Sequence, residues 1–378
     1  MKEMLKINCR LYYRIKQFKN QFIVICLLSL IIVSSLLKSE EPPVGNITVH
    51  DLPKCSSTDK LDLNKDMRAA ELVQFSEDGS KIKGPFIYRP YLNCLNQEDD
   101  RLTDLIRDEY IRPPNNKLLY LNGMEVNSDT AYEITRNEQV VDITELVYKN
   151  QVPRNGFYLE AGSHDGINSM SFEFELVHNW TGVLVEADVW LYTHSLELNR
   201  KSYQIHTCLA VEKTPHFGMF DMVSAVRGKG LYSMGGLSSN PHEFSMQMQC
   251  FPLYSIIKAL GNPVINLLIL DVEGAEQLIL ETLPWDKVDI EIMTVETDLV
   301  GKSISGGSQS QASIRALIES KGYRRYPHRM EKNEITGLEQ NDLFIREDIV
   351  KKYNVTDYPI YSKSNENRQI VLKNLDKL

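Results

Sequence analysis

The sequence predicts an α/β fold with a Rossmann-like, mostly parallel, seven-stranded sheet, preceded by one N-terminal transmembrane helix and a stalk. Three observations predict it. From about residue 155, short apolar runs alternate with amphipathic helical windows, an order typical of a parallel sheet covered by helices. Two short segments near the end of this region can pair as a hairpin and close the sheet. Near the N-terminus, an uncharged apolar run follows a basic stretch.

Composition narrows the class of protein further. The 378 residues are 25% charged and 42% hydrophobic, which excludes a collagenous, low-complexity or wholly disordered chain. The net charge is −9, yet residues 1–19 hold six Lys or Arg and one Glu. The rest of the chain, with 36 of the 42 basic and 50 of the 51 acidic residues, therefore carries −14. Such an acidic body argues against a nucleic-acid-binding protein.

The apolar run at residues 22–37, FIVICLLSLIIVSSLL, contains no charge. As a helix it would be about 24 Å long, slightly less than the roughly 27 Å core of the endoplasmic reticulum membrane. Because the basic residues precede it, we expect an uncleaved type II signal anchor, with residues 1–21 cytosolic and the chain after Lys38 lumenal. A cleaved signal peptide and a buried core helix are the alternatives. The exit Leu36-Leu37-Lys38 lacks the small residues that a cleavage site needs.

Three Asn-x-Thr triplets agree with a lumenal address. They begin at Asn46, Asn179 and Asn354, which are therefore glycosylation candidates. Each triplet alone is weak evidence, because such triplets also arise by chance.

Four cysteines follow the predicted span, and an even number in an oxidising compartment suggests two disulfides. Among the three connectivities we favour Cys208–Cys250 and Cys55–Cys94, because each pair falls within one segment. Free buried thiols are the alternative. No Cys or His spacing predicts zinc, and we expect no metal site.

The chain divides into six parts. We expect a cytosolic tail at 1–21, the anchor at 22–37, a lumenal stalk at 38–100, a helical lead-in at 101–154, the main domain at 155–350 and a polar tail at 351–378. In the lead-in, residues 101–112 show helical spacing before Pro113, and Asp142 with Glu145 predicts a capping box.

In the main domain the expected strands are Phe157–Ala161, Gly182–Ala187, Gln204–Ala210, Ile265–Val272 and Ile290–Thr297, closed by Tyr323–Pro327 and Asp342–Arg346. The expected helices are 168–178, 189–200, 252–260, 274–283 and 311–321, and residues 223–248 form either a disordered loop or a lid.

The first predicted strand runs into Gly162-Ser163-His164-Asp165-Gly166. Gly162 and Gly166 bracket a tight turn from strand to helix, where backbone can approach a ligand closely. Twenty residues beyond Gly166, Glu186 ends the second strand, where a carboxylate can accept both hydroxyls of a ribose. The spacing therefore predicts a nucleoside site, with a plain turn and a solvated Glu186 as the alternative.

The fourth predicted strand ends in Asp271-Val272-Glu273-Gly274. Ligands of open α/β sheets bind beyond the carboxyl ends of the strands, so Asp271 can serve as a general base or a polar clamp. The alternative is that Asp271 and Glu273 cap the next helix. His164 is a second, tentative candidate for taking a proton. With Glu296 at the end of the fifth strand these acids form a rim that could hold a divalent metal, but nothing in the spacing fixes such a site.

Together the segments GFYLEAGSHDG, GVLVEAD, LILDVEGAE and LPWDKVDIEIMTVE resemble the FkbM methyltransferase family. They are most similar to its invertebrate type II membrane branch, which includes the insect protein Star. The resemblance spans about residues 101–350 and implies a class I methyltransferase fold for 155–350. It also implies S-adenosylmethionine as cofactor and O-methylation as the reaction. The site residues that it implies are Glu160, Gly162 and Gly166 along the methionine and adenosine side, Glu186 on the ribose and Asp271 near the methyl group.

The Star-like branch implies a second function. Its members escort transmembrane growth-factor precursors of the EGF type from the endoplasmic reticulum towards the Golgi, with the methyltransferase fold as a binding platform. Ser163-His164-Asp165 departs from the small, neutral stretch of bacterial members and adds bulk and charge beside the cofactor. We therefore expect a trafficking factor of the ER and Golgi membranes, with endosome or plasma membrane as further addresses. An active lumenal O-methyltransferase is the alternative, and a glycan-related or purely structural protein is a third.

Overall fold

The structure is a computed structural model, and it describes residues 92–114, 138–221, 245–297, 310–327 and 341–356, with five two-residue strands between positions 74 and 237. All of them lie in the unit Cys55–Leu378. The predicted anchor, the cytosolic tail, most of the stalk and the chain after residue 356 lie outside the described residues. Of the helices in the described ranges, none is both long and apolar enough to span a bilayer.

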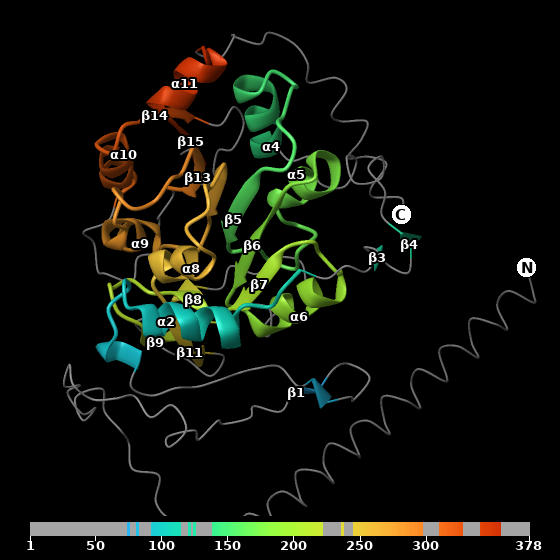
Figure 1. Ribbon diagram of the computed structural model, residues 1–378, viewed down its shortest axis with the longest axis vertical. Helices are drawn as coiled ribbons and strands as arrows, with labels where there is room; N and C mark the ends of the chain where they lie inside the picture. Colours follow the sequence, from blue (N-terminus) through green and yellow to red (C-terminus); the bar gives the residue numbers. More distant parts are fainter. Residues whose placement is uncertain are drawn as a thin grey trace, which may run out of the picture. The chain divides into compact units, whose positions relative to one another are not determined.

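A seven-stranded sheet forms the centre of the domain (Figure 1). Its order is β14-β15-β13-β12-β5-β6-β7. The strands from β13 to β7 pair in parallel, and β15 is antiparallel to both of its neighbours. The predicted mostly parallel sheet with a closing hairpin is confirmed. The strands are β5 Phe157–Ala161, β6 Thr181–Glu186, β7 Tyr203–His206, β12 Leu267–Leu270, β13 Ile292–Glu296, β14 Tyr323–Pro327 and β15 Asn341–Arg346.

Helices cover both faces of this sheet because successive side chains of a strand point to opposite faces. Leu159 of β5 belongs to the core shared with α2, α8, α9 and α10, whereas Tyr158 belongs to the core shared with α4, α5 and α11. All four residues of β12 are buried, as expected for a central parallel strand. The helices are α2 Asp100–Leu105, α4 Glu138–Asp142, α5 Ser171–His178, α6 Val189–Glu197, α8 Leu253–Ala259, α9 Glu276–Thr282, α10 Gln311–Glu319 and α11 Glu347–Tyr353.

Two helices of the lead-in continue into a single π-helical turn. Helix α2 continues as η3 Ile106–Tyr110 and α4 as η4 Ile143–Val147. The helix predicted across residues 101–112 is thus present. The capping box predicted for Asp142 and Glu145 is wrong, because the helix already begins at Glu138. Asp142 consequently has helical backbone angles and makes no cap hydrogen bond.

A four-stranded sheet of order β10-β9-β11-β8 is inserted between β7 and α8. The single strand predicted at Gln204–Ala210 is therefore wrong, because the chain leaves the main sheet after β7 and enters the second one. Thr207 lies at this change and donates its hydroxyl to the Gln249 carbonyl at 2.7 Å. The other strands of the insert were not predicted, and the expected loop 223–248 overlaps two of them. The insert comprises β8 Cys208–Leu209, β9 His216–Asp221, β10 Gly236–Leu237 and β11 Ser245–Phe251.

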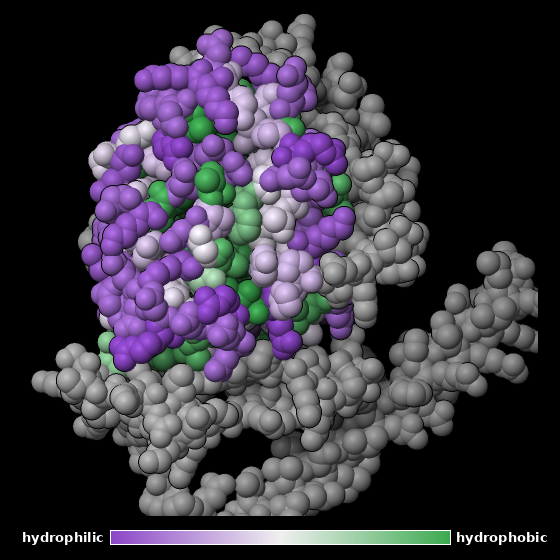
Figure 2. All heavy atoms as spheres, viewed as in Figure 1, coloured by the Kyte–Doolittle hydropathy of each residue, from purple (hydrophilic) through white to green (hydrophobic). Residues whose placement is uncertain are grey.

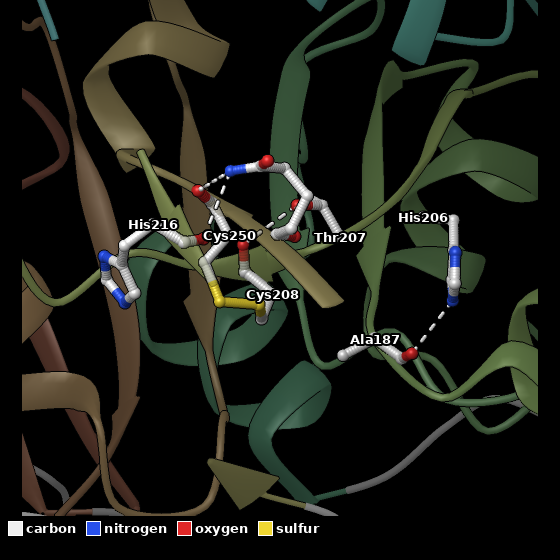
Figure 3. The surroundings of a disulfide bond; sticks show 7 residues. Ala187, His206, Thr207, Cys208, His216 and Cys250 are labelled. Atoms are coloured by element: carbon white, nitrogen blue, oxygen red, sulfur yellow. Dashed lines mark hydrogen bonds between the residues drawn. A yellow bond between two sulfur atoms is a disulfide. The ribbon is translucent and has the colours of Figure 1, made fainter. Parts of the chain in front are cut away.

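The predicted disulfide between Cys208 and Cys250 is present in this second sheet (Figure 3). The two residues are direct partners in the parallel β8–β11 pair, with Cα atoms 4.4 Å apart. Gly218 of β9 leaves room for the bond, since a Cβ there would lie 2.7 Å from the Cys250 Sγ. Cys94 is also disulfide-bonded. Its expected partner, Cys55, lies outside the described residues, so that pairing stays a prediction.

One face of the domain is largely polar. Figure 2 shows this mostly hydrophilic face, on which hydrophobic residues are visible in smaller areas, including one down the middle and one at the lower edge. Within the described ranges, Trp190 and Val264 are the large apolar side chains that are exposed. Single exposed apolar residues of this kind are ordinary on soluble domains.

Candidate active site

A pocket lies at the carboxyl ends of β5, β6 and β12, where the strand order reverses. In open α/β sheets this switch point is where ligands bind. Gly162, Glu186 and Asp271 end or follow these three strands, and all three line the pocket. The volume of this pocket that is open to water-sized molecules is about 40 Å³. Apolar side chains supply much of the remaining wall: Val185, Leu209, Phe220, Leu237, Val272 and Ile279.

The predicted glycine turn is present, and close packing explains both glycines. Gly162 has φ of +84°, and a Cβ there would lie 1.8 Å from the carbonyl oxygen of Asp271. Its N–H donates to the Val185 carbonyl at 3.0 Å. Gly166 has φ of +78°, and its Cβ would meet the Ser195 hydroxyl at 2.5 Å. The turn therefore packs against neighbouring strand ends and α6 in a way that only glycine allows.

Glu160 is not among the described residues that line the pocket. Its carboxylate lies under the first turn of α5, where it accepts hydrogen bonds from the Met170 N–H at 2.8 Å and from the Ser171 N–H at 3.3 Å. Burial raises the pKa of this carboxyl, although the hydrogen bonds from Ser169 and Ser171 oppose the rise. The structure thus places Glu160 at the start of α5, on the face of β5 opposite Ala161, and its place beside a cofactor stays a prediction.

A buried ion pair between Arg200 and Glu175 supports the glycine turn. Both side chains are fully buried, and the guanidinium Nε lies 3.0 Å from the carboxylate. Arg200 also donates to the carbonyl of Gly166 and, at 3.2 Å, to the Tyr158 hydroxyl. The attraction of Arg200, together with several hydrogen bonds, keeps the pKa of Glu175 below its usual value in spite of burial. This pair could not be predicted from the sequence, because Arg200 stands in an ordinary polar stretch after α6.

Glu186 lies at the tip of β6 and is 6% exposed. Its two carboxylate oxygens accept the backbone N–H groups of His164 at 2.7 Å and of Asp188 at 2.8 Å. Burial nevertheless raises the pKa of this carboxyl to about 8. At neutral pH the group therefore holds a proton most of the time, and it can donate as well as accept a hydrogen bond at the pocket wall.

His164 lies next to Glu186 but is not among the described pocket-lining residues. Its Nδ1 is 3.3 Å from the carboxylate of Asp165. Burial lowers the pKa of His164, but the hydrogen bond and charge of Asp165 outweigh burial and raise it above its usual value. The same contact helps to hold the pKa of Asp165 at about 2. The ring is thus engaged with Asp165, which makes it a weaker candidate for a base than Asp271.

The turn that carries Asp271 is shaped by Glu276. This buried carboxylate accepts the N–H groups of Val272 at 2.8 Å and of Gly274 at 2.9 Å. Glu273 between them has φ of +62°. The alternative that Asp271 or Glu273 caps α9 is not observed, since the N-cap position is Ala275 without a side-chain hydrogen bond. Glu276 ends the segment LILDVEGAE, but the sequence pattern did not indicate this role.

The structure also brings together the three acidic residues that were predicted to form a rim. Asp271, Glu273 and Glu296 each offer a carboxylate oxygen, and these atoms lie within 4.8 Å of one another. They come from the ends of adjacent strands β12 and β13. The rim places three carboxyl groups together at the edge where the pocket lies.

The buried carboxyl of Glu276 predicts a pH dependence of stability. Burial raises its pKa from 4.5 to about 8, so between these values the folded state binds more protons than the unfolded state. Its contribution to stability is complete below pH 4.5 and is lost as the pH rises through about 8. We expect Glu276→Gln to reduce the fall in melting temperature between pH 5 and pH 8.5, as followed by circular dichroism. Glu281→Gln, on the exposed side of the same helix, is the control, and equal falls in all three proteins would contradict the assignment.

Residues 160–325 match the model of the methyltransferase FkbM domain. The matched span contains both glycines of the turn, Glu186 and Asp271. The observed sheet, with its antiparallel strand inserted next to the edge, has the order of class I methyltransferases. Among curated proteins, none matches this sequence.

Solved methyltransferase structures are distantly similar to the chain. A TehB-like, S-adenosylmethionine-dependent methyltransferase from Corynebacterium glutamicum is 10% identical, with 60% of this chain and 90% of that one covered and a TM-score of 0.29. Magnesium protoporphyrin IX methyltransferase from Synechocystis, with bound S-adenosylmethionine, is 14% identical over 56% and 79%, with a TM-score of 0.29. A Leishmania major S-adenosylmethionine-dependent methyltransferase is 9% identical over 72% and 95%, with a TM-score of 0.28.

Proposed function

Because the chain carries an FkbM methyltransferase domain at residues 160–325, we propose that its pocket binds S-adenosylmethionine and that the domain methylates a hydroxyl oxygen of a lumenal acceptor. One observation carries this proposal. Gly162, Glu186 and Asp271, from three separate strand ends, meet in one pocket at the switch point of the sheet.

The residues of the pocket fit this cofactor. Glu186, a carboxyl that both donates and accepts at neutral pH, suits the two hydroxyls of a ribose. The apolar side chains of Leu209, Phe220 and Ile279 suit the faces of an adenine ring. When bound, S-adenosylmethionine supplies an electrophilic methyl group. Asp271 would orient the acceptor hydroxyl and accept its proton at a carboxylate oxygen.

A lumenal address is part of the proposal. The disulfide between Cys208 and Cys250 supports it, because disulfides persist mainly in oxidising compartments. The basic N-terminus followed by the apolar run at 22–37 supports a type II anchor in the membranes of the endoplasmic reticulum and Golgi.

Calorimetric titration of the full-length chain in detergent with S-adenosylmethionine tests the cofactor site. We expect micromolar binding, weakened about tenfold in Glu186→Ala because leaving buried ribose hydroxyls without their partner costs roughly 1–3 kcal/mol. Glu197→Ala, exposed at the end of α6, should bind like the wild type. Near-ultraviolet circular dichroism checks that both variants are folded. Equal binding by Glu186→Ala and wild type would remove Glu186 from the site.

A trafficking factor is the second candidate, and one observation favours it. The pocket offers only about 40 Å³ to water-sized molecules, which is little space for a cofactor, and the inserted sheet supplies part of its lining through Cys208, Phe220 and Leu237. The resemblance to the Star-like branch then implies recognition of EGF-type transmembrane precursors by the lumenal domain. A folded wild-type chain that binds no S-adenosylmethionine but retains such a precursor in a pull-down would favour this candidate over the enzyme.

A further inference from the structure

Two of the three Asn-x-Thr triplets fall on described residues, and their asparagines have the same local structure. Asn179 ends α5 with φ of +57°, and Asn354 ends α11 with φ of +49°. Both side chains are exposed. Asparagine is common at such left-handed helix ends, which explains the asparagines themselves. The cap does not require the threonine that stands two residues after each of them.

Asn179 lies at the edge of the sheet opposite the pocket. It precedes β6, which starts at Thr181 and ends at Glu186 in the pocket wall. Six strand residues span about 17 Å, at roughly 3.3 Å per residue. An attachment at Asn179 is therefore separated from the pocket by the length of the strand.

Asn354 belongs to the same edge. Strand β15 is antiparallel to β13, and its last residue, Arg346, donates its N–H to the Glu291 carbonyl just before β13 begins. Helix α11 therefore starts at the amino ends of the parallel strands, and its C-terminal cap is Asn354.

Aromatic contacts join the two asparagine sites. The Tyr148 ring packs edge-on against Trp180 at 6.3 Å and against Tyr353 at 5.1 Å between ring centroids. These two rings are the immediate neighbours of Asn179 and Asn354 in the sequence. Lys149 donates to the Asn354 carbonyl at 3.1 Å, and Figure 1 shows α4 between α5 and α11. Tyr148 and Trp180 are buried, so these contacts hold the C-terminal ends of α5 and α11 close together. We call the surface around these two helix ends, with Asn179 and Asn354 exposed on it, the amino-edge patch.

We propose that Asn179 and Asn354 both carry N-linked glycans, which cover the amino-edge patch and leave the pocket at the opposite edge open to acceptor or cargo. The proposal rests on the lumenal address proposed above. In the reaction, the side-chain amide nitrogen bonds to the anomeric carbon of a lipid-linked oligosaccharide, loses one proton, and the lipid pyrophosphate leaves. The Asn179 nitrogen keeps its second hydrogen, which suffices for its present 2.7 Å bond to the Asn155 side-chain oxygen.

The test uses the full-length chain made in a eukaryotic cell with an active secretory pathway. Treatment with a peptide N-glycosidase should increase the electrophoretic mobility of the wild type. Asn179→Gln and Asn354→Gln should each lose one glycan, and the double variant two. Thr181→Ala should lose the same glycan as Asn179→Gln, because the acceptor triplet needs its threonine. Asn155→Gln, which removes the neighbouring amide but no triplet, should keep both glycans.

The presence or absence of a glycan at Asn46 distinguishes failure of this inference from failure of the proposed lumenal address. A chain with a glycan at Asn46 but none at Asn179 or Asn354 would be lumenal, and the amino-edge proposal would be overturned. A chain without a glycan at any of the three asparagines would overturn the lumenal address as well. Mobility on a denaturing gel reports the glycans even where a variant fails to fold.

Discussion

Gly162→Ala is expected to destabilise the domain strongly and to displace Asp271 from the pocket. A Cβ at position 162 would lie 1.8 Å from the Asp271 carbonyl oxygen, a backbone atom that cannot swing away. The left-handed backbone adds its own penalty, with φ of +84°. Strain of this kind costs about 1–3 kcal/mol, and overpacking costs about 1–3 kcal/mol more. For a domain of this size the melting temperature should fall by about 10 °C, at roughly 2–4 °C per kcal/mol.

The chain offers a matched control for this variant. Gly261 has almost the same backbone angle, with φ of +85°, but a Cβ there would meet nothing within 4 Å. Gly261→Ala therefore carries the backbone strain without the collision. Thermal denaturation of both variants separates the two effects. Equal losses of stability would show that the contact with Asp271 is not the reason for glycine at position 162.

Arg200→Met should also destabilise the domain, by about 3–5 kcal/mol, because it leaves a buried carboxylate without its counter-charge. The carboxylate is that of Glu175, which is fully buried 3.0 Å from the guanidinium. The variant also removes the hydrogen bond to the Gly166 carbonyl, so the glycine turn should loosen. Urea denaturation measures the first effect, and titration with S-adenosylmethionine measures the second.

Two further variants test whether the buried charge is responsible. The double variant Arg200→Met with Glu175→Gln should recover part of the lost stability, because neither charge then stays buried alone. Arg324→Met breaks a pair with Glu347 whose side chains are 46% and 42% exposed. That surface pair should matter by less than about 1 kcal/mol. Similar losses in Arg200→Met and Arg324→Met would contradict the role given to burial.

Elements with a local signature could be predicted, and non-local ones could not. The apolar run of β12 and the glycine turn after β5 depend on neighbouring residues, so their positions follow from the pattern. Strand β8 is only Cys208–Leu209 and pairs with a strand about forty residues later. Because its stability comes from that distant partner and not from its own sequence, the prediction merged it with β7.

The candidate site also has a part that the sequence could predict and a part that it could not. Spacing alone placed Gly162, Glu186 and Asp271 at strand ends, and parallel strands bring such ends to one edge. Spacing could not show where a carboxylate points. Glu160 lies in the same motif as Gly162, yet side chains alternate along β5, and this one serves α5 instead of the pocket.

The sequence by itself determined the α/β class, the order of the main-sheet strands along the chain and which strand ends carry polar residues, and it favoured the pairing of Cys208 with Cys250. Periodicity, glycine spacing and cysteine position are local properties, and local properties can be read without coordinates. Only the tertiary structure decided that Arg200 holds the glycine turn, that Glu276 shapes the turn of Asp271, and that Asn179 and Asn354 share one edge. The contacts of Arg200 and of the two asparagine sites join residues far apart in the sequence. Glu276 contacts a turn only two to four residues away, but that contact too forms because folding buries charges and backbone groups that must then find partners.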